Sequence, residues 1–362
     1  MCSQFTDPTR PATIRSSIFP FSVTCGQQVS AADWWSTCEA DPGATFFATP
    51  EWSDILTSSF DHFCSKPFLF SFGHGIKRVI PAIEVKRWGG HLTAVHSMPF
   101  GTYGGIVGPP LHTVDEVDTI LRFVTGGTRR RFQTTICPNP LSDSIPDMLV
   151  TGKGHVHAPD LAGGWEAWWQ GLDAKTRYSV RKAERRGVEV RSDMDPVTYE
   201  TFYNLHTRLA RHWDKPNPFG ERFFQSMWQM QSPRIQLWTA HKQGRMLAGV
   251  LVFRFQKQAV TFLSFVSPQA RALAPKNLIY TRLIQRACEE GWTQLSFLGS
   301  GGKEGIERFK QSMGGRRREF RFVNVRTPLY RFAGHPIRRI RGLGCRFLQP
   351  VPPPGQELIF PR

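Results

Sequence analysis

Residues 295–314 read LSFLGSGGKEGIERFKQSMG. The segment Gln294–Leu298 predicts a short strand, and the glycines that follow it predict a loop. Residues 303–313 then predict a short helix that carries the pair Phe309-Lys310 near its end. This order of strand, glycine loop and helix predicts a late βαβ unit in the chain.

The residues before and after this stretch continue the alternation of helix and strand patterns. Helices are expected at 172–186, 196–209, 221–231 and 276–290, and strands at 188–192, 235–240, 246–255, 259–266 and 319–325. Helices that flank a largely antiparallel sheet define an α+β fold class.

The N-terminal half has weaker patterns. Residues 1–28 form a poorly patterned leader rich in Ser, Thr and Pro, and a glycine-rich stretch covers 100–108. Helices are expected at 31–40, 50–60 and 113–125, a strand at 129–136, and a hairpin at 68–72 and 79–85 around Gly73-His74-Gly75.

The hairpin has the same rhythm as residues 235–250, which favours a tandem of two similar domains, although chance recurrence of a common motif explains it equally well. We therefore expect an N-terminal domain at 1–150, a second domain at 151–333 and a basic tail at 334–362.

The charge balance indicates an anionic partner. The 46 Lys and Arg exceed the 29 Asp and Glu by 17, and such a field concentrates tRNA, nucleotide-linked precursors or an acidic lipid surface. Residues 314–362 contain eleven Arg against Glu319 and Glu357, so this segment supplies nine of the seventeen charges. A solvated basic surface is the alternative, because charge alone does not identify a ligand.

The seven cysteines form no C-x-x-C pair, and their odd number favours reduced thiols. No stretch approaches the ~20 apolar residues of a spanning helix. We expect a cytoplasmic protein without a transmembrane segment, with peripheral contact at the inner face of the cell membrane left open.

Two further segments carry candidate binding residues. In the helix expected after Asp173, Arg177, Arg181 and Arg185 recur every four residues, and together with Lys182 they form a basic face that can bind phosphates. A solvated helix face is the alternative.

The second segment is the loop at 266–275 and the start of the following helix. Its Gln269-x-x-Ala272-x-Ala274 matches the spacing of an acyl-CoA motif but lacks the central glycine, so a methyl group stands where the phosphate approaches. The donor-binding candidates are Gln269, Arg271, Lys276 and Asn277, which surround a helix N-terminus.

Taken together, these segments resemble the Fem and FemAB-related transferases of the GNAT superfamily. The resemblance rests on the basic helix, the helix ending Glu-Gly-Trp, the strand with Gly-Ser, and Phe-Lys before Met-Gly-Gly. Met98–Gly105, MPFGTYGG, is similar to a stretch of FemAB-related proteins associated with exopolysaccharide and exosortase gene clusters.

The resemblance implies two GNAT-like halves, with the acceptor bound in the groove between them and the donor carried by the C-terminal half. It assigns Phe309 and Lys310 to the donor channel, where Lys310 stabilises phosphate or oxyanion charge. Tyr103, from the N-terminal motif, falls on the acceptor side.

The same resemblance implies that the acceptor amine attacks the donor carbonyl directly, without a covalent enzyme intermediate. Proton acceptors are sought among Glu304, Glu307, His206 and His212, of which Glu304 is included in the catalytic set. No tightly bound cofactor is expected. His155-x-His157-x-x-Asp160 has metal-ligand spacing, but strand alternation explains it better, so no metal site is predicted.

The predicted function is therefore N-acyl transfer, from acyl-CoA or aminoacyl-tRNA, to an amine of a cell-envelope precursor such as one for peptidoglycan or exopolysaccharide. The alternative is a non-catalytic protein that binds an anionic polymer, tRNA or a lipid surface. The sequence alone suggests that Lys310→Ala abolishes transfer with little change in melting temperature.

Overall fold

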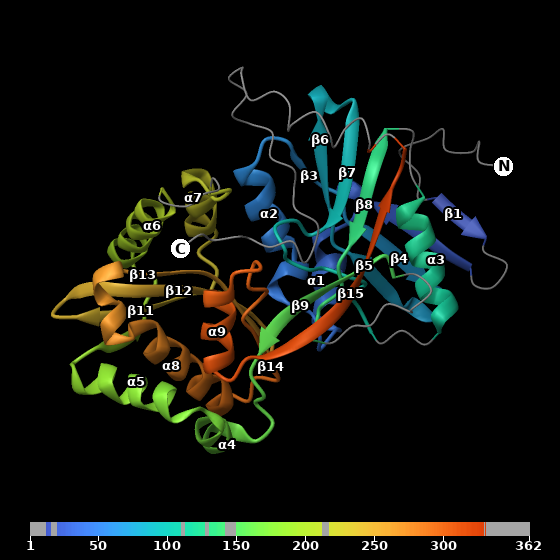
Figure 1. Cartoon of the computed structure of the whole chain (residues 1–362). Helices are drawn as coiled ribbons and strands as arrows, with labels where there is room; N and C mark the ends of the chain where they lie inside the picture. Colours follow the sequence, from blue (N-terminus) through green and yellow to red (C-terminus); the bar gives the residue numbers. More distant parts are fainter. Residues whose placement is uncertain are drawn as a thin grey trace. The chain divides into compact units, whose positions relative to one another are not determined.

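The computed structural model describes residues 12–15, 20–109, 113–126, 130–141, 150–211, 217–328 and 330. These residues divide into two compact units (Figure 1). The first contains the residues up to 153 and those from 321 onward, and the second contains 154–320. The basic tail predicted at 334–362 lies outside the described residues.

The first unit contains helices α1 (Ala31–Glu39), α2 (Pro50–Ser59) and α3 (Val114–Thr125). Its strands are β1 (Ala12–Arg15), β2 (Pro20–Cys25), β3 (Phe63–Ser65), β4 (Phe68–Phe72), β5 (Lys77–Ile80), β6 (Ile83–Arg87), β7 (Leu92–Ser97) and β8 (Arg131–Ile136). One sheet has the order β1-β2-β4-β5 and a second has the order β3-β6-β7-β8-β15-β9. Strands β9 (Gly152–Ala158) and β15 (Arg316–Arg326) each have residues in both units.

Two predictions for this half are wrong. The leader at 1–28 contains β1 and β2, whose short alternation, with Phe21 and Val23 buried, is hidden among Ser, Thr and Pro. The strand predicted at 79–85 is two strands, β5 and β6, which belong to different sheets. Pro81 lies at the break, because proline has no N–H to continue a ladder.

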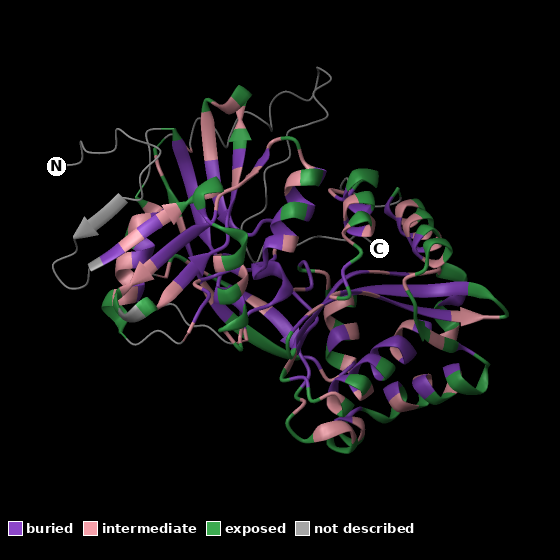
Figure 2. Ribbon diagram, turned by 180° about the vertical axis from the view of Figure 1, so that it is seen from behind, coloured by how far each residue is buried: buried purple, intermediate pink, exposed green. Residues whose placement is uncertain are grey.

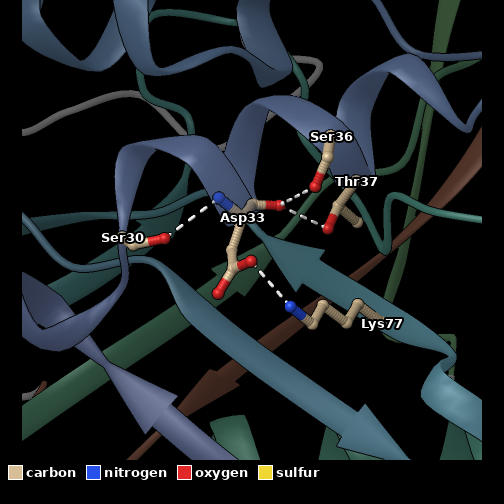
Figure 3. A network of polar contacts seen from close by, with 5 residues as sticks. All are labelled: Ser30, Asp33, Ser36, Thr37 and Lys77. Atoms are coloured by element: carbon tan, nitrogen blue, oxygen red, sulfur yellow. Dashed lines mark hydrogen bonds and ion pairs between the residues drawn. The ribbon is translucent and has the colours of Figure 1, made fainter.

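Helix α1 begins at a polar network that connects it to β5 (Figure 3). The Ser30 hydroxyl accepts a hydrogen bond from the Asp33 backbone N–H at 3.0 Å, and the Asp33 carboxylate lies 2.6 Å from the Lys77 ammonium. The Ser36 and Thr37 hydroxyls donate to the Asp33 carbonyl. Lys77 lowers the pKa of Asp33, but both side chains are more than a third exposed, so the pair contributes only about 0–1 kcal/mol.

The second unit is built on a five-stranded sheet of order β10-β11-β12-β13-β14. Its strands are β10 (Glu189–Ser192), β11 (Ile235–Lys242), β12 (Arg245–Phe255), β13 (Gln258–Val266) and β14 (Gln294–Ser296). The helices are α4 (Gly164–Gly171), α5 (Ala174–Arg185), α6 (Pro196–Ala210), α7 (Glu221–Met230), α8 (Pro275–Glu289) and α9 (Glu304–Ser312).

Helices α5 and α8 cover one face of this sheet, and α6 and α7 cover the other (Figure 1). The strands between them are largely buried (Figure 2).

The α+β prediction is confirmed, and most predicted boundaries differ from the observed ones by only a few residues. The helix predicted at 172–186 begins two residues later, where Asp173 caps α5 by accepting a hydrogen bond from the Thr176 N–H at 2.6 Å.

Strands β13 and β14 stay together for only three residues. They pair in parallel from Gln258↔Gln294 to Val260↔Ser296, although β13 continues to Val266. Just beyond this ladder, the pairing of β13 with β12 contains a β-bulge between Val250 and Val252. A bulge bends and twists a strand, which favours the separation of β13 from β14.

Gly249 on β12 shows how closely α6 packs on this sheet. A Cβ atom at Gly249 would lie 2.6 Å from Cδ2 of the buried Phe202 ring and 3.0 Å from Phe265. Gly249→Ala is therefore expected to destabilise the protein by about 1–3 kcal/mol through overpacking. Urea unfolding measures this, with Gly171→Ala as control because the added methyl group meets open space. Equal stability of the two variants would contradict the packing.

Candidate functional site

After Ser296, the chain no longer pairs with β13, and its next residues form backbone hydrogen bonds with β9 instead. The Phe297 N–H donates to the His157 carbonyl at 2.7 Å, and the His157 N–H donates to the Leu298 carbonyl at 3.1 Å. Leu298 has φ of 58°, an uncommon conformation for any residue other than glycine. The glycine loop at 299–302 therefore starts from an unfavourable backbone conformation that its surroundings must hold.

Lys310 holds this loop from helix α9. Its side chain is only 7% exposed, and its ammonium group donates to the carbonyl of Leu298 at 3.1 Å and to the carbonyl of Gly299. The hydrogen bonds neutralise the cost of burying both the cation and the carbonyl groups. Lys310 thus positions the glycine loop, a role that the sequence did not predict.

A polar cluster lies beside Lys310. His157 is fully buried, and its Nε2 is 3.7 Å from a carboxylate oxygen of Glu307. The other carboxylate oxygen of Glu307 is 3.5 Å from the Ser300 hydroxyl. Burial, and then the Lys310 charge, lowers the pKa of His157, which keeps the ring neutral at pH 7. The sequence analysis attributed the two histidines of β9 to strand alternation, so it missed this cluster.

On its other side, α9 contributes an aromatic surface that meets α8. The Phe309 ring packs edge-to-face on Tyr280 with centroids 5.1 Å apart. The Lys276 ammonium lies 4.5 Å from the Phe309 centroid and 5.6 Å from the Tyr280 centroid. The Asn277 amide lies 3.5 Å from the sulfur of Met313. The structure thus brings Phe309 together with Lys276 and Asn277, which the sequence analysis placed in a separate segment.

Lys276 has no hydrogen-bond or ion-pair partner among the described residues and rests on aromatic faces alone. Burial lowers its pKa to about 8. A half-buried amine of this kind changes charge close to neutral pH and attracts anions while it is protonated.

The loop before α8 uses two of its backbone donors within its own turn. Pro268–Leu273 form a 3₁₀ turn, in which the Ala270 N–H bonds to Ser267 and the Ala274 N–H bonds to Arg271. Ala274 has φ of 51°, and Pro275 occupies the first position of α8, where it offers no N–H. Gln269 and Arg271 are exposed on this turn.

The basic face of α5 is divided among several contacts. Arg177 donates to the carbonyls of Gln170 and Leu172 at the end of α4, so its guanidinium group serves to cap that helix. Arg181 is exposed and lies 5.8 Å from the Trp169 ring centroid, and Lys182 is half-buried. Arg177 is therefore engaged within the protein, and it does not contribute a free guanidinium group to the basic stripe predicted from the sequence.

The other candidates make contacts of their own. Tyr103 is 2% exposed in the core of the first unit, packed edge-to-face on Phe47. His206 is fully buried against Phe202 and Phe224, and burial lowers its pKa to about 4. Glu304 is exposed and pairs with Arg308 at 3.1 Å. His212 lies outside the described residues.

In the described ranges, no group of three or more His, Cys, Asp or Glu side chains is arranged to hold a metal ion. Nor does any described helix combine the length and apolar character needed to cross a membrane.

A family model for an acetyltransferase (GNAT) domain matches residues 173–311. A crystal structure of FemX matches with TM-score 0.68 at 12% identity, over 85% of this chain and 99% of that chain. A conserved protein of unknown function from Bacteroides thetaiotaomicron matches with TM-score 0.52 at 13% identity, over 85% and 100%.

The C-terminal domain of a putative lysylphosphatidylglycerol synthetase from Agrobacterium fabrum matches with TM-score 0.50 at 12% identity, over 84% of this chain and 94% of that chain. No curated protein matches the sequence significantly. The chain therefore has a tandem GNAT-like α+β fold that matches FemX, and the match to the GNAT-domain family model lies in its C-terminal half. At these identities, the structural matches show the fold alone.

Because Lys310 is buried and bonded to two carbonyl groups, we revise the expectation that its loss leaves stability unchanged. Lys310→Met keeps the apolar stem but leaves those carbonyls unsatisfied, which is expected to cost about 1–3 kcal/mol. Urea unfolding measures this against Arg308→Met, a change at an exposed site on the same helix that should stay within about 0.5 kcal/mol. A Lys310→Met protein as stable as this control would refute the positioning role.

Lys276 generates a prediction about pH. Its folded-state pKa of about 8 lies below its ordinary value of 10.5, so between these values the unfolded chain binds more protons than the folded protein. Stability should therefore gain from this group as pH rises through that window, with a slope of at most about 1.36 kcal/mol per pH unit.

Lys276→Met should remove this gain and stabilise the protein at pH 7, whereas Lys175→Met, a change at an exposed position on α5, should do neither. Urea unfolding from pH 7 to pH 10 compares the three proteins. A wild-type slope that survives in Lys276→Met would show that another group is responsible.

Proposed function

We propose that the chain is a GNAT-type N-acyltransferase that moves an aminoacyl or acyl group to an amine of a cell-envelope or exopolysaccharide precursor. The reaction takes place on the cytoplasmic side, where both donor classes are made, with peripheral contact at the inner face of the membrane. The second unit binds the donor, and the first unit contributes acceptor binding.

The observation that carries this proposal is the divergence of β13 from β14. Beyond Val260, the edge of β13 that faced β14 has no ladder partner in β14, so its backbone groups can bind an extended acyl donor. The aromatic pair Phe309 and Tyr280, with the Lys276 ammonium above it, lies on the helices that flank this divergence. Apolar surface and a cation together suit a donor with an acyl group and a phosphate-bearing carrier.

The loop before α8 favours aminoacyl-tRNA over acyl-CoA as the donor. A pyrophosphate is usually held by free backbone N–H groups at a helix N-terminus. Here the 3₁₀ turn consumes the N–H groups of Ala270 and Ala274, and Pro275 supplies none. Ala272, exposed on the turn, adds a methyl group there. A donor that does not require a pyrophosphate cradle fits these residues better.

Phe309 and Lys310 keep distinct roles in this proposal. Phe309 contacts the donor, while Lys310 fixes the glycine loop and lends positive charge to the developing oxyanion. Transfer then depends mainly on holding amine and carbonyl together, which is a large source of rate enhancement in such reactions.

The test offers the purified chain two labelled donors, alanyl-tRNA and acetyl-CoA. The acceptor probe is a nucleotide-linked peptidoglycan precursor with a free lysine amine. We expect label to pass from alanyl-tRNA, with Phe309→Ala lowering kcat/KM about tenfold, equivalent to about 1.4 kcal/mol. Trp88→Ala, a change at an exposed aromatic residue of the first unit, is the control that should leave kcat/KM unchanged.

Saturable calorimetric binding of acetyl-CoA, with transfer from it alone, would reverse the donor preference but keep the reaction class. Binding of tRNA or anionic vesicles without transfer from either donor would favour the alternative of a non-catalytic binding protein. Its binding should then weaken steeply with salt.

A further inference from the structure

His157 is a buried imidazole without hydrogen-bonding partners for its ring. The side chain is fully buried, and neither ring nitrogen forms a hydrogen bond within the described part of the chain. Its backbone is bonded to Phe297 and Leu298, so the ring is held in place by the strand. Buried polar groups without partners are rare and often mark a functional site.

The carboxylate of Glu307 faces this ring. Its oxygen lies 3.7 Å from Nε2 of His157, so a small movement would form a hydrogen bond. Glu307 is 28% exposed while His157 is fully buried, so the carboxylate is the solvent-facing end of the pair. The Ser300 hydroxyl, 3.5 Å from the second carboxylate oxygen, limits rotation from the loop side.

The charges around this pair come from three elements. His155 on β9 packs edge-to-face on His157 with centroids 5.7 Å apart. Helix α9 contributes Lys310, and β15 contributes Arg317 and Glu319, whose charges act on His155. Because His157 is neutral and an anion faces Nε2, its proton is favoured on that nitrogen, with the N–H directed at the carboxylate.

We propose that Glu307 is the general base that takes the proton from the acceptor amine and that His157 is the positioning residue that orients its carboxylate. The inference rests on the proposed function and identifies the base that it requires. It selects Glu307 over Glu304, whose carboxylate is 74% exposed and paired with Arg308.

The proton and bond changes balance without any further reactant. The amine nitrogen forms a bond to the donor carbonyl carbon while its proton passes to the Glu307 carboxylate. The C–O bond of an aminoacyl ester, or the C–S bond of a thioester, then breaks. Glu307 returns the proton to the leaving oxygen or sulfur, so the carboxylate is regenerated.

The test measures transfer against pH with whichever labelled donor the wild-type chain uses. Glu307→Gln should lower kcat at least about 100-fold and remove the acid limb of the profile. His157→Phe should shift the acid limb, because the imidazole N–H that faces the Glu307 carboxylate at 3.7 Å is lost. His157→Gln, which keeps an N–H donor, should restore the limb. Glu200→Gln, at an exposed site on α6, should match wild type.

Three outcomes would overturn the proposal. The first is an unchanged acid limb in Glu307→Gln. The second is its loss in Glu304→Gln instead. The third is a fall in rate for both His157 variants without a shift in pH dependence, which would indicate a merely structural histidine.

A second measurement separates this proposal from the proposed function. The His157 ring nitrogens are followed by NMR across pH in wild type and Glu307→Gln. Removing the facing negative charge should lower the pKa of His157 further, even if no donor is ever used. An unchanged His157 titration would show that the pair is uncoupled and would refute the dyad, whereas absent transfer with a coupled pair would refute only the reaction.

Discussion

The ammonium group of Lys310 lies inside the second unit and is bonded to the carbonyls of Leu298 and Gly299. The backbone turn at Leu298 depends on these bonds, because its positive φ is unfavourable for a residue that has a Cβ atom. This turn allows residues 297 and 298 to form backbone hydrogen bonds with β9. That pairing places His157 beside Glu307. A single buried cation therefore determines the geometry of both the glycine loop and the polar cluster.

Two lysines in this region have opposite environments. Lys310 is buried but surrounded by oxygen acceptors, whereas Lys276 rests on Phe309 and Tyr280 without an acidic partner among the described residues. The first arrangement stabilises the charged form and favours a fixed structure. The second leaves a cation whose burial lowers its pKa to about 8, which suits it to a transient anionic ligand.

The residues singled out by motif divide into those that gather where α8 meets α9 and those that support the fold. Phe309, Lys276 and Asn277 lie together at the contact of α8 with α9. Arg177 caps a helix, and Tyr103 and His206 are core residues. A residue type suited to chemistry is often equally suited to capping or packing, and only burial and partners distinguish these uses.

Local patterns were sufficient for the α+β class and for most elements of the second half, because the periodicity of a helix or a strand is visible within a short stretch of sequence. They could not reveal the split of residues 79–85 between two sheets, nor β1 and β2 within an apparent leader. The approach of His157 to Glu307 joins residues 150 positions apart, and the carbonyls bound by Lys310 are backbone groups common to every residue. Such contacts depend on where strands pair and chains turn, and this is decided only by the tertiary structure.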